Sequence, residues 1–291
     1  VADIAAVGPG VWNEWKGTLL RELYLATERH LMGEEDASSG TQARVAVRIE
    51  STLERAETRQ YTGFKAVLQC LPWRAVMGFP PRQLLRIGQL MLAEPDGGVA
   101  LLVDESRGES LVIVLAPDRK RLLVDLTAAL SSGFVNIVAA HAYQIDSTRV
   151  LDVFHVQGGH GKALCEKNDL NRLQQRIKKV IAGDDVSKVQ PVKQDVLMQQ
   201  VSVSARPLPL ASSRQTAIEV VAADRAGLLA ALATEIDDAG FSVRGASIST
   251  FGERVVDVFF LTHGNGETLS KEEKDMVCER LSQAAELPAV Q

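Results

Sequence analysis

A pattern of about 105 residues occurs twice in this chain of 291 residues, and it constrains the fold more than any other feature. Asp118–Leu123 reads DRKRLL, and Asp224–Leu229 reads DRAGLL 106 residues later. Arg149–Phe154 (RVLDVF) and Arg254–Phe259 (RVVDVF) follow in the same order, 105 residues apart. Because chance would give one such match but not several in order, the chain contains two copies of one structural unit.

Each copy has short apolar runs that alternate with amphipathic patterns, which predicts the order strand–helix–strand–strand–helix. A further strand would complete βαββαβ, the ferredoxin-like sandwich with helices on one face of an antiparallel sheet. The first copy is expected to find this strand at 201–205. The second copy has only residues 287–291 after its last helix, so it should lack its own final strand. A spare strand at 99–104 is expected to fill an edge left open in one of the sheets.

Residues 1–93 have a different character, because helical periodicity dominates and all three Trp residues lie there. The segment Glu94–Gly98 (EPDGG) breaks this pattern and marks a domain boundary. The predicted fold class is therefore α+β. A helical segment at 1–93 precedes one ferredoxin-like unit at 98–206 and a second at 213–291.

Composition narrows the classes of protein to be considered. The formal net charge of −5 argues against a nucleic-acid partner, which would need a clustered basic face. The chain has no run of 18 apolar residues, so we expect no membrane-spanning helix. Its three Cys residues lie far apart, which is typical of reduced thiols in a cytoplasmic protein.

The DRAGLL turn between a first strand and a first helix resembles the ACT domain, a small module that binds amino acids. Two further features restrict this resemblance to a smaller group of ACT-containing proteins. They are the tandem arrangement of the two copies and the preceding segment Ala2–Tyr24, which contains the sequence GPGVW. Over nearly the whole chain, the sequence resembles the bifunctional uridylyltransferase/uridylyl-removing enzymes of bacterial nitrogen control. Such an enzyme adds UMP to the signalling protein PII when glutamine is scarce, and removes it when glutamine is plentiful. The resemblance implies that this chain is the glutamine-sensing regulatory region.

The same resemblance implies that both catalytic centres lie outside this chain. Asp3 matches the last metal-binding Asp of the family's HD phosphohydrolase domain, but no His in the sequence is followed by Asp. The Gly-Ser and Asp-x-Asp motifs of the transferase site are absent as well. We therefore expect Asp3 to be part of an incomplete metal site, and the chain to hold no cofactor and to be inactive alone. The resemblance implies Mg²⁺ or Mn²⁺ for the missing catalytic domains.

The turn before the first helix of each copy is the expected ligand site. A helix N-terminus offers N–H groups and partial positive charge to a carboxylate, and glycine lets a ligand approach the backbone. The candidate residues are Asp224, Arg225, Gly227, Leu228 and Leu229 in the second copy, and Asp118 and Arg119 in the first. We favour the second turn, because Arg121 replaces glycine in the first, where it could block the turn or attract another anion. Helix capping is the alternative role for both Asp residues.

Glutamine and, through the full-length enzyme, PII are the expected partners, together with pairing of the two ACT units or of two chains. Two alternatives remain open: an interaction scaffold without a small ligand, and the regulatory end of an alarmone synthetase/hydrolase. The second alternative should carry a further β-rich domain between its HD and ACT modules. Asp152 and Asp257, in the two RVxDVF strands, are expected at a sheet edge or a partner surface.

Overall fold

The computed structural model describes residues 37–55, 63–106, 108–131, 135–158, 161–184, 201–209, 215–225, 227–251 and 254–286. The chain divides into two units, Val1–Pro95 and Asp96–Gln291. The division falls within the Glu94–Gly98 segment that breaks the helical pattern.

The described part of the first unit is helical, with α3 (Ala37–Arg55), α4 (Phe64–Gln69), α5 (Trp73–Gly78) and α6 (Pro81–Ala93). Proline at the first position of α6 suits a helix start, because the missing N–H would have no partner there. Gly88 lets α6 lie close to α4, since a Cβ atom at this position would be 2.6 Å from Cζ of Phe64. The predicted helix that carries Trp12 and Trp15 lies outside the described residues.

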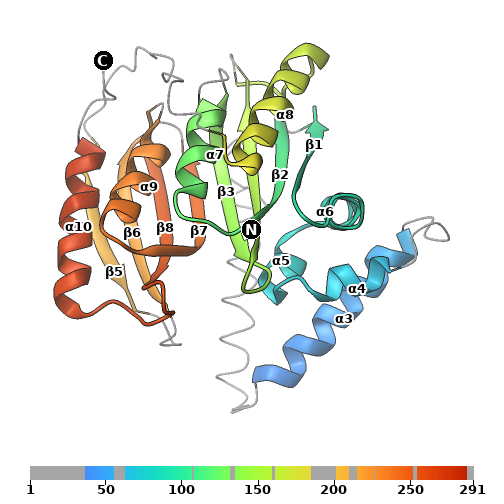
Figure 1. Ribbon diagram of the computed structural model, residues 1–291, viewed down its shortest axis with the longest axis horizontal. Coiled ribbons are helices and arrows are strands. Elements are labelled where there is room, and N and C mark those ends of the chain that lie inside the picture. The colour runs from blue at the N-terminus through green and yellow to red at the C-terminus, as the bar shows by residue number, and fades with distance from the viewer. Residues whose placement is uncertain are drawn as a thin grey trace, which may run out of the picture. The chain divides into compact units, whose positions relative to one another are not determined.

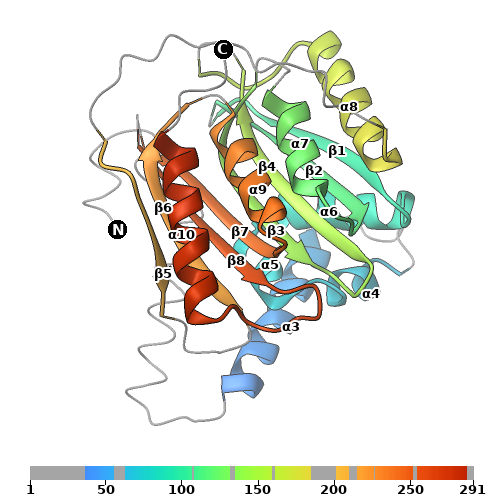
Figure 2. The same ribbon diagram turned by 60° about the vertical axis from the view of Figure 1, so that its left-hand side comes forward.

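The second unit contains one eight-stranded antiparallel sheet in the order β1-β2-β4-β3-β7-β8-β6-β5. Its strands are β1 (Gly98–Asp104), β2 (Glu109–Pro117), β3 (Asn136–Gln144), β4 (Arg149–Gln157), β5 (Ser204–Leu208), β6 (Thr216–Ala223), β7 (Ser242–Phe251) and β8 (Arg254–Thr262). The helices are α7 (Leu122–Ser131), α8 (Lys167–Ala182), α9 (Leu228–Asp238) and α10 (Lys271–Glu286). All four cover the same face of the sheet (Figures 1 and 2).

Each copy has the strand order of a ferredoxin-like fold, but its outer strand comes first in the chain. β1 pairs with β2 from Gly98 to Asp104, which confirms that the spare strand fills an open edge. The strand expected to complete the first copy instead pairs with β6 of the second, so this expectation and the boundary at residue 206 are wrong. β1 already occupies the edge of β2 that a ferredoxin-like fold reserves for its last strand. The second copy, which has no strand after α10 among the described residues, receives β5 at the corresponding edge.

The two copies join edge to edge through β3 and β7, from Ala139 opposite Ser249 to Tyr143 opposite Gly245. In the centre of this ladder His141 faces Ser247, and these two residues occupy the same position in the two copies. A pseudo-twofold axis therefore passes between them. The predicted pairing of the two copies is confirmed, and it occurs within one chain.

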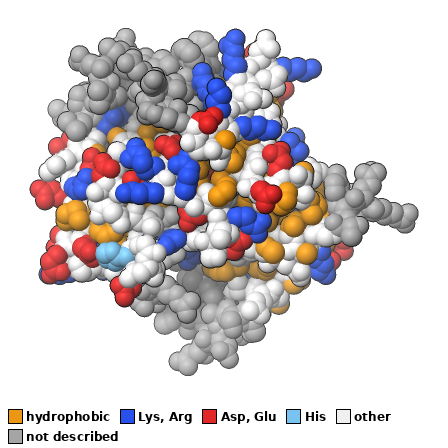
Figure 3. Space-filling view, viewed as in Figure 1, with side chains coloured by type: hydrophobic (Ala, Val, Ile, Leu, Met, Phe, Trp, Pro, Cys, Tyr) orange, Lys and Arg blue, Asp and Glu red, His pale blue; other side chains and the backbone are white. Residues whose placement is uncertain are grey.

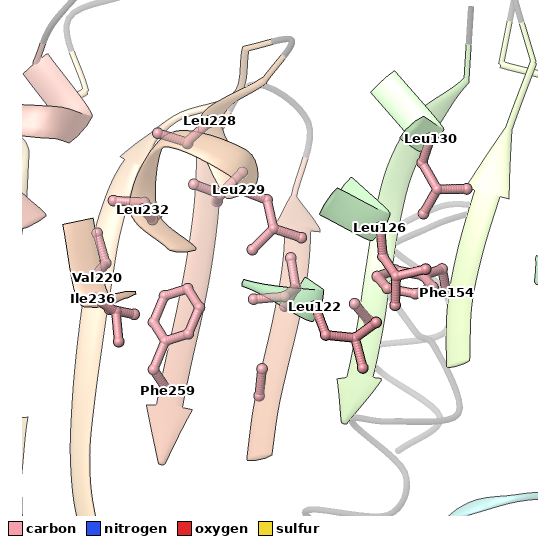
Figure 4. Close-up of a cluster of buried hydrophobic side chains, with 14 of the residues drawn as sticks. Leu122, Leu126, Leu130, Phe154, Val220, Leu228, Leu229, Leu232, Ile236 and Phe259 are labelled. Atoms are coloured by element: carbon pink, nitrogen blue, oxygen red, sulfur yellow. The ribbon is translucent and has the colours of Figure 1, made fainter. Parts of the chain in front are cut away.

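The core between the sheet and its helices repeats with this symmetry. Phe154 on β4 packs under the leucines of α7, and Phe259 on β8 packs under α9 (Figure 4). Both rings are at most 1% exposed. Complete burial of such a side chain contributes about 1.5–3 kcal/mol, and both rings belong to one apolar cluster that the four helices share.

Candidate functional site

The turn after β2 is held in place by contacts to neighbouring elements. The N–H of Asp118 donates a hydrogen bond of 2.7 Å to the carbonyl oxygen of Thr148. Arg119 donates to the carbonyl oxygen of Val180 on α8 at 3.0 Å, and pairs with Asp125 at 2.7 Å. Arg119 thus anchors the turn that begins α7.

Arg121 neither blocks this turn nor changes its backbone. Its φ of 64° is left-handed, as is the φ of 79° at Gly227, its counterpart in the second copy. A residue with a side chain loses about 1–2 kcal/mol in this conformation. The guanidinium extends to the carboxylates of Asp237 at 3.6 Å and Asp238 at 3.7 Å, where α9 ends. The strained residue therefore links the first copy to the second.

A cavity of about 470 Å³ lies at this junction. Its walls come from the turn after β2, the facing ends of β3 and β4, and the segment that leads from α9 into β7. The residues that give it chemical character include Asp118, Lys120, Tyr143, Asp152, Phe241 and Arg244. Lys120 and Arg121 of the turn pair with Asp237 and Asp238 at the end of α9, and Figure 3 shows Lys and Arg side chains next to Asp and Glu on this face.

Arg244 reaches the cavity because β7 is irregular where it stands. The register against β8 shifts between Val243 and Gly245, and such bulges redirect a side chain. The guanidinium lies 3.6 Å from the carboxylate of Asp118, and it donates to Oε1 of Gln144 at 3.0 Å. It therefore joins the end of β3 to the first turn. The corresponding bulge in β3 carries Val138, so the pseudo-symmetric position has no such cation.

Asp152 and Asp257 lie in central strands and not at a sheet edge, which corrects the prediction from sequence. They are 4% and 1% exposed, on the face that packs against the helices. Burial raises the pKa of Asp152 to about 7, with a further contribution from the charge of Asp118. Burial raises the pKa of Asp257 to about 8 against the hydrogen bond from the Ser249 N–H, and the charge of Asp224 adds to the rise.

The favoured second turn has an anchor equivalent to that of Arg119. Arg225 donates to the carbonyl oxygen of Ala284 at 2.6 Å and so ties the turn to the end of α10. Leu228 and Leu229 point into the core (Figure 4). Burial raises the pKa of Asp224, while the hydrogen bond from the Arg225 N–H opposes this change.

Of the seven residues predicted to bind a ligand, Asp118 and Arg119 line the cavity, whereas the five of the second turn do not. Sequence reasoning missed Asp237, Phe241 and Arg244. One signal was available for Arg244, because it stands 106 residues after Val138 and breaks the agreement between the copies.

Metal ligands do not gather in the part of the chain that the structure describes. No group of three or more His, Cys, Asp or Glu side chains there could hold a metal ion. Asp3, the residue expected in an incomplete metal site, lies outside the described residues. Within the same ranges, no helix combines the length and apolar character needed to cross a membrane.

Comparison with known proteins identifies an ACT domain in the second copy. The ACT domain model matches residues 216–275. The bifunctional uridylyltransferase/uridylyl-removing enzyme of Phenylobacterium zucineum is 35% identical over 94% of this chain and 30% of its own length. The enzymes of that name from Caulobacter vibrioides and Vibrio vulnificus are 35% and 31% identical, over 91% and 97% of this chain. This chain is related to the bifunctional uridylyltransferase/uridylyl-removing enzymes.

The chain spans about a third of the length of these relatives, 29–33%. The first copy has the same ferredoxin-like strand order as the ACT domain of the second, and the two copies form one sheet. Aspartate kinase from Synechocystis is similar over 55% of this chain and 25% of its own length, with 18% identity and a TM-score of 0.32.

Proposed function

We propose that this chain is the glutamine-sensing regulatory region of a uridylyltransferase/uridylyl-removing enzyme. In this proposal glutamine binds in the cavity between the two copies. The observation that carries the proposal is the composition of the cavity wall, which brings carboxyl groups, cations and a helix N-terminus together at the junction. A volume of about 470 Å³ falls in the range of small-molecule sites.

The cavity suits the two charges of a free amino acid. The first N–H groups of α7, near Leu123 and Val124, have no acceptor within the helix and attract a carboxylate. Lys120 adds positive charge on the same side, while Asp118 and Asp152 offer negative charge to an ammonium group. Gln144 adds an amide that can hydrogen-bond a carboxamide side chain. These groups complement a zwitterion with an uncharged polar side chain.

A ligand in this position contacts both copies and can therefore change how they are arranged. The ion pairs of Arg121 with Asp237 and of Arg244 with Asp118 cross the junction beside the cavity. A ligand that favours one arrangement of these contacts shifts the population towards it. We propose that this shift controls whether the enzyme adds UMP to PII or removes it. Both reactions, and the Mg²⁺ or Mn²⁺ they would use, belong to catalytic domains that the described residues do not include.

Isothermal titration calorimetry with glutamine tests this function, and the repeat supplies a matched pair of variants. Asp118 and Asp224 are equivalent, but of these two only Asp118 lines the cavity. We expect Asp118→Ala to weaken glutamine binding about tenfold or more, the loss of one charge-assisted hydrogen bond, and Asp224→Ala to change it less than about twofold. The opposite result would place the ligand at the second turn.

The scaffold alternative has support from the continuous sheet that joins the copies through β3 and β7. The two functions differ in the thermal stability they predict. A ligand of the folded state at 100 times its Kd stabilises the protein by about 2.7 kcal/mol. An unchanged melting temperature at millimolar glutamine would therefore favour the scaffold over the sensor.

A further inference from the structure

One carboxyl group in the cavity wall has no partner of opposite charge. The carboxylates of Asp118 and Asp237 both pair with arginine, at 3.6 Å in each case. Asp152 makes no hydrogen bond or ion pair with any side chain in the ranges that the structure describes, although it is 4% exposed. The cations of the wall are each paired with another carboxylate: Arg119, Lys120, Arg121 and Arg244.

The position of Asp152 makes this isolation costly. Its neighbours across the sheet are Val114 on β2 and Ala142 on β3, and Phe154 follows on the same face of β4. An apolar residue would be expected in this column, because a buried polar group without a hydrogen bond costs several kcal/mol in transfer free energy. The side chain nevertheless lines the cavity together with Ala142 and Asp118. A cation that enters the cavity would therefore find one carboxyl group without an oppositely charged partner in its wall.

We propose that the Asp152 carboxyl receives the ammonium group of the bound amino acid and selects ligands that carry one. This inference rests on the function proposed above and identifies the residue that recognises the α-amino group. A buried ion pair without other hydrogen bonds gives little net stability, but removing one partner of such a pair is expensive. Ligands without the ammonium group would leave Asp152 unpaired and lose the corresponding affinity.

Binding of an ammonium group should also release a proton from this site. The pKa of Asp152 lies at about 7, so close to half of the free protein carries a proton there at neutral pH. A neighbouring cation favours the ionised form and so drives the proton off. The other titratable groups that face the cavity are Asp118, Arg119, Lys120, Arg121, Tyr143, Asp237 and Arg244. A variant that lacks the carboxyl group of Asp152 therefore identifies this residue as the source of the released proton.

Calorimetry of the 291-residue chain with glutamine measures this proton directly. At pH 7 the apparent binding enthalpy should differ between phosphate and Tris buffers. The expected difference is about half of the difference between the ionisation enthalpies of the two buffers, because about half a proton is released per ligand bound. Affinity should fall about tenfold from pH 8 to pH 6, because the ionised fraction of Asp152 falls by that factor. Both measurements use the unmodified protein and so do not depend on the folding of a variant.

Asp152→Asn tests the residue, and Asp257→Asn is its matched control. Asp257 occupies the equivalent strand position and is 1% exposed, but it does not line the cavity. We expect Asp152→Asn to weaken glutamine binding tenfold or more and to abolish proton release. Asp257→Asn should leave both unchanged. Glutaramate, which is glutamine without its amino group, should bind both variants and the original protein equally weakly, because the contact with Asp152 is already lost.

The outcomes separate this inference from the function on which it rests. If glutamine does not bind the original chain, both are wrong. If glutamine binds with equal enthalpy in the two buffers, or binds Asp152→Asn as tightly as the original, only the assignment of Asp152 is overturned. Equal binding of glutaramate and glutamine to the original chain would also overturn it.

Discussion

The buried carboxyl of Asp257 gives a prediction about stability that does not depend on any ligand. Burial raises its pKa from 3.8 to about 8, so the folded protein keeps this proton at pH values where the unfolded chain has lost it. Unfolding in this window releases a proton. The free energy of unfolding that this group contributes is therefore fully present below pH 3.8 and is lost as pH rises to about 8.

The size of the effect follows from the same two values. Each pH unit inside the window changes the contribution by about 1.4 kcal/mol, so the loss between pH 5 and pH 8 is about 3–4 kcal/mol. Asp257→Asn replaces the protonated carboxyl by a neutral group of similar shape that does not titrate. The variant should therefore gain about 3–4 kcal/mol relative to the original protein over these three pH units.

Urea unfolding followed by far-ultraviolet circular dichroism measures this difference at each pH. Tryptophan fluorescence is unsuitable, because Trp12, Trp15 and Trp73 all lie in the first unit and not in the copy that contains Asp257. Burial also lowers the pKa of His141 to about 3, which opposes the trend below pH 6.5 in both proteins and cancels in the comparison. A difference that stays constant within about 1 kcal/mol from pH 5 to pH 8 would refute a buried, protonated Asp257.

Four further substitutions test local features of the second unit. Gly227→Ala should lower the free energy of unfolding in urea by about 1–2 kcal/mol, because φ is 79° at this position and a side chain disfavours the left-handed conformation. Arg121→Ala should cost less, because a residue with a side chain already adopts this conformation there. Arg225→Ala removes the hydrogen bond to the carbonyl oxygen of Ala284, so amide exchange in the last turn of α10 should accelerate severalfold while that of α8 does not. Phe259→Ala should lower the free energy of unfolding by about 3–5 kcal/mol, since the ring is fully buried, and a loss below 1 kcal/mol would contradict the packing described for it.

Much of the fold could be predicted because it depends on local pattern. Short continuous apolar runs define strands such as Glu109–Pro117, and helical spacing defines α7 and α9. The repeat of DR-x-x-LL and RV-x-DVF showed that these elements occur as two similar units. The edge strand Gly98–Asp104 could be anticipated as well, since the repeat left it without a role.

The candidate site was only partly predictable, because its residues meet through contacts between the copies. Asp118 and Arg119 could be recognised from the turn that they form. Arg244 lies more than 120 residues away in sequence, and only the β3–β7 ladder and a bulge bring it to Asp118. The position of the cavity at the first turn follows from that ladder, so no property of either turn alone could reveal it.

Residue type and spacing along the chain were enough to predict most of the elements, their repetition and the resemblance to the bifunctional uridylyltransferase/uridylyl-removing enzymes. Three features depend on the folded chain: the partner of Ser204–Leu208, the burial of Asp152 and Asp257, and the place where the two copies enclose a cavity. A strand has the same hydrogen-bonding groups whichever edge it joins, so its partner depends on which edges the rest of the fold leaves free. A carboxyl group likewise acquires its pKa from the groups packed around it, and these come together only when the chain folds.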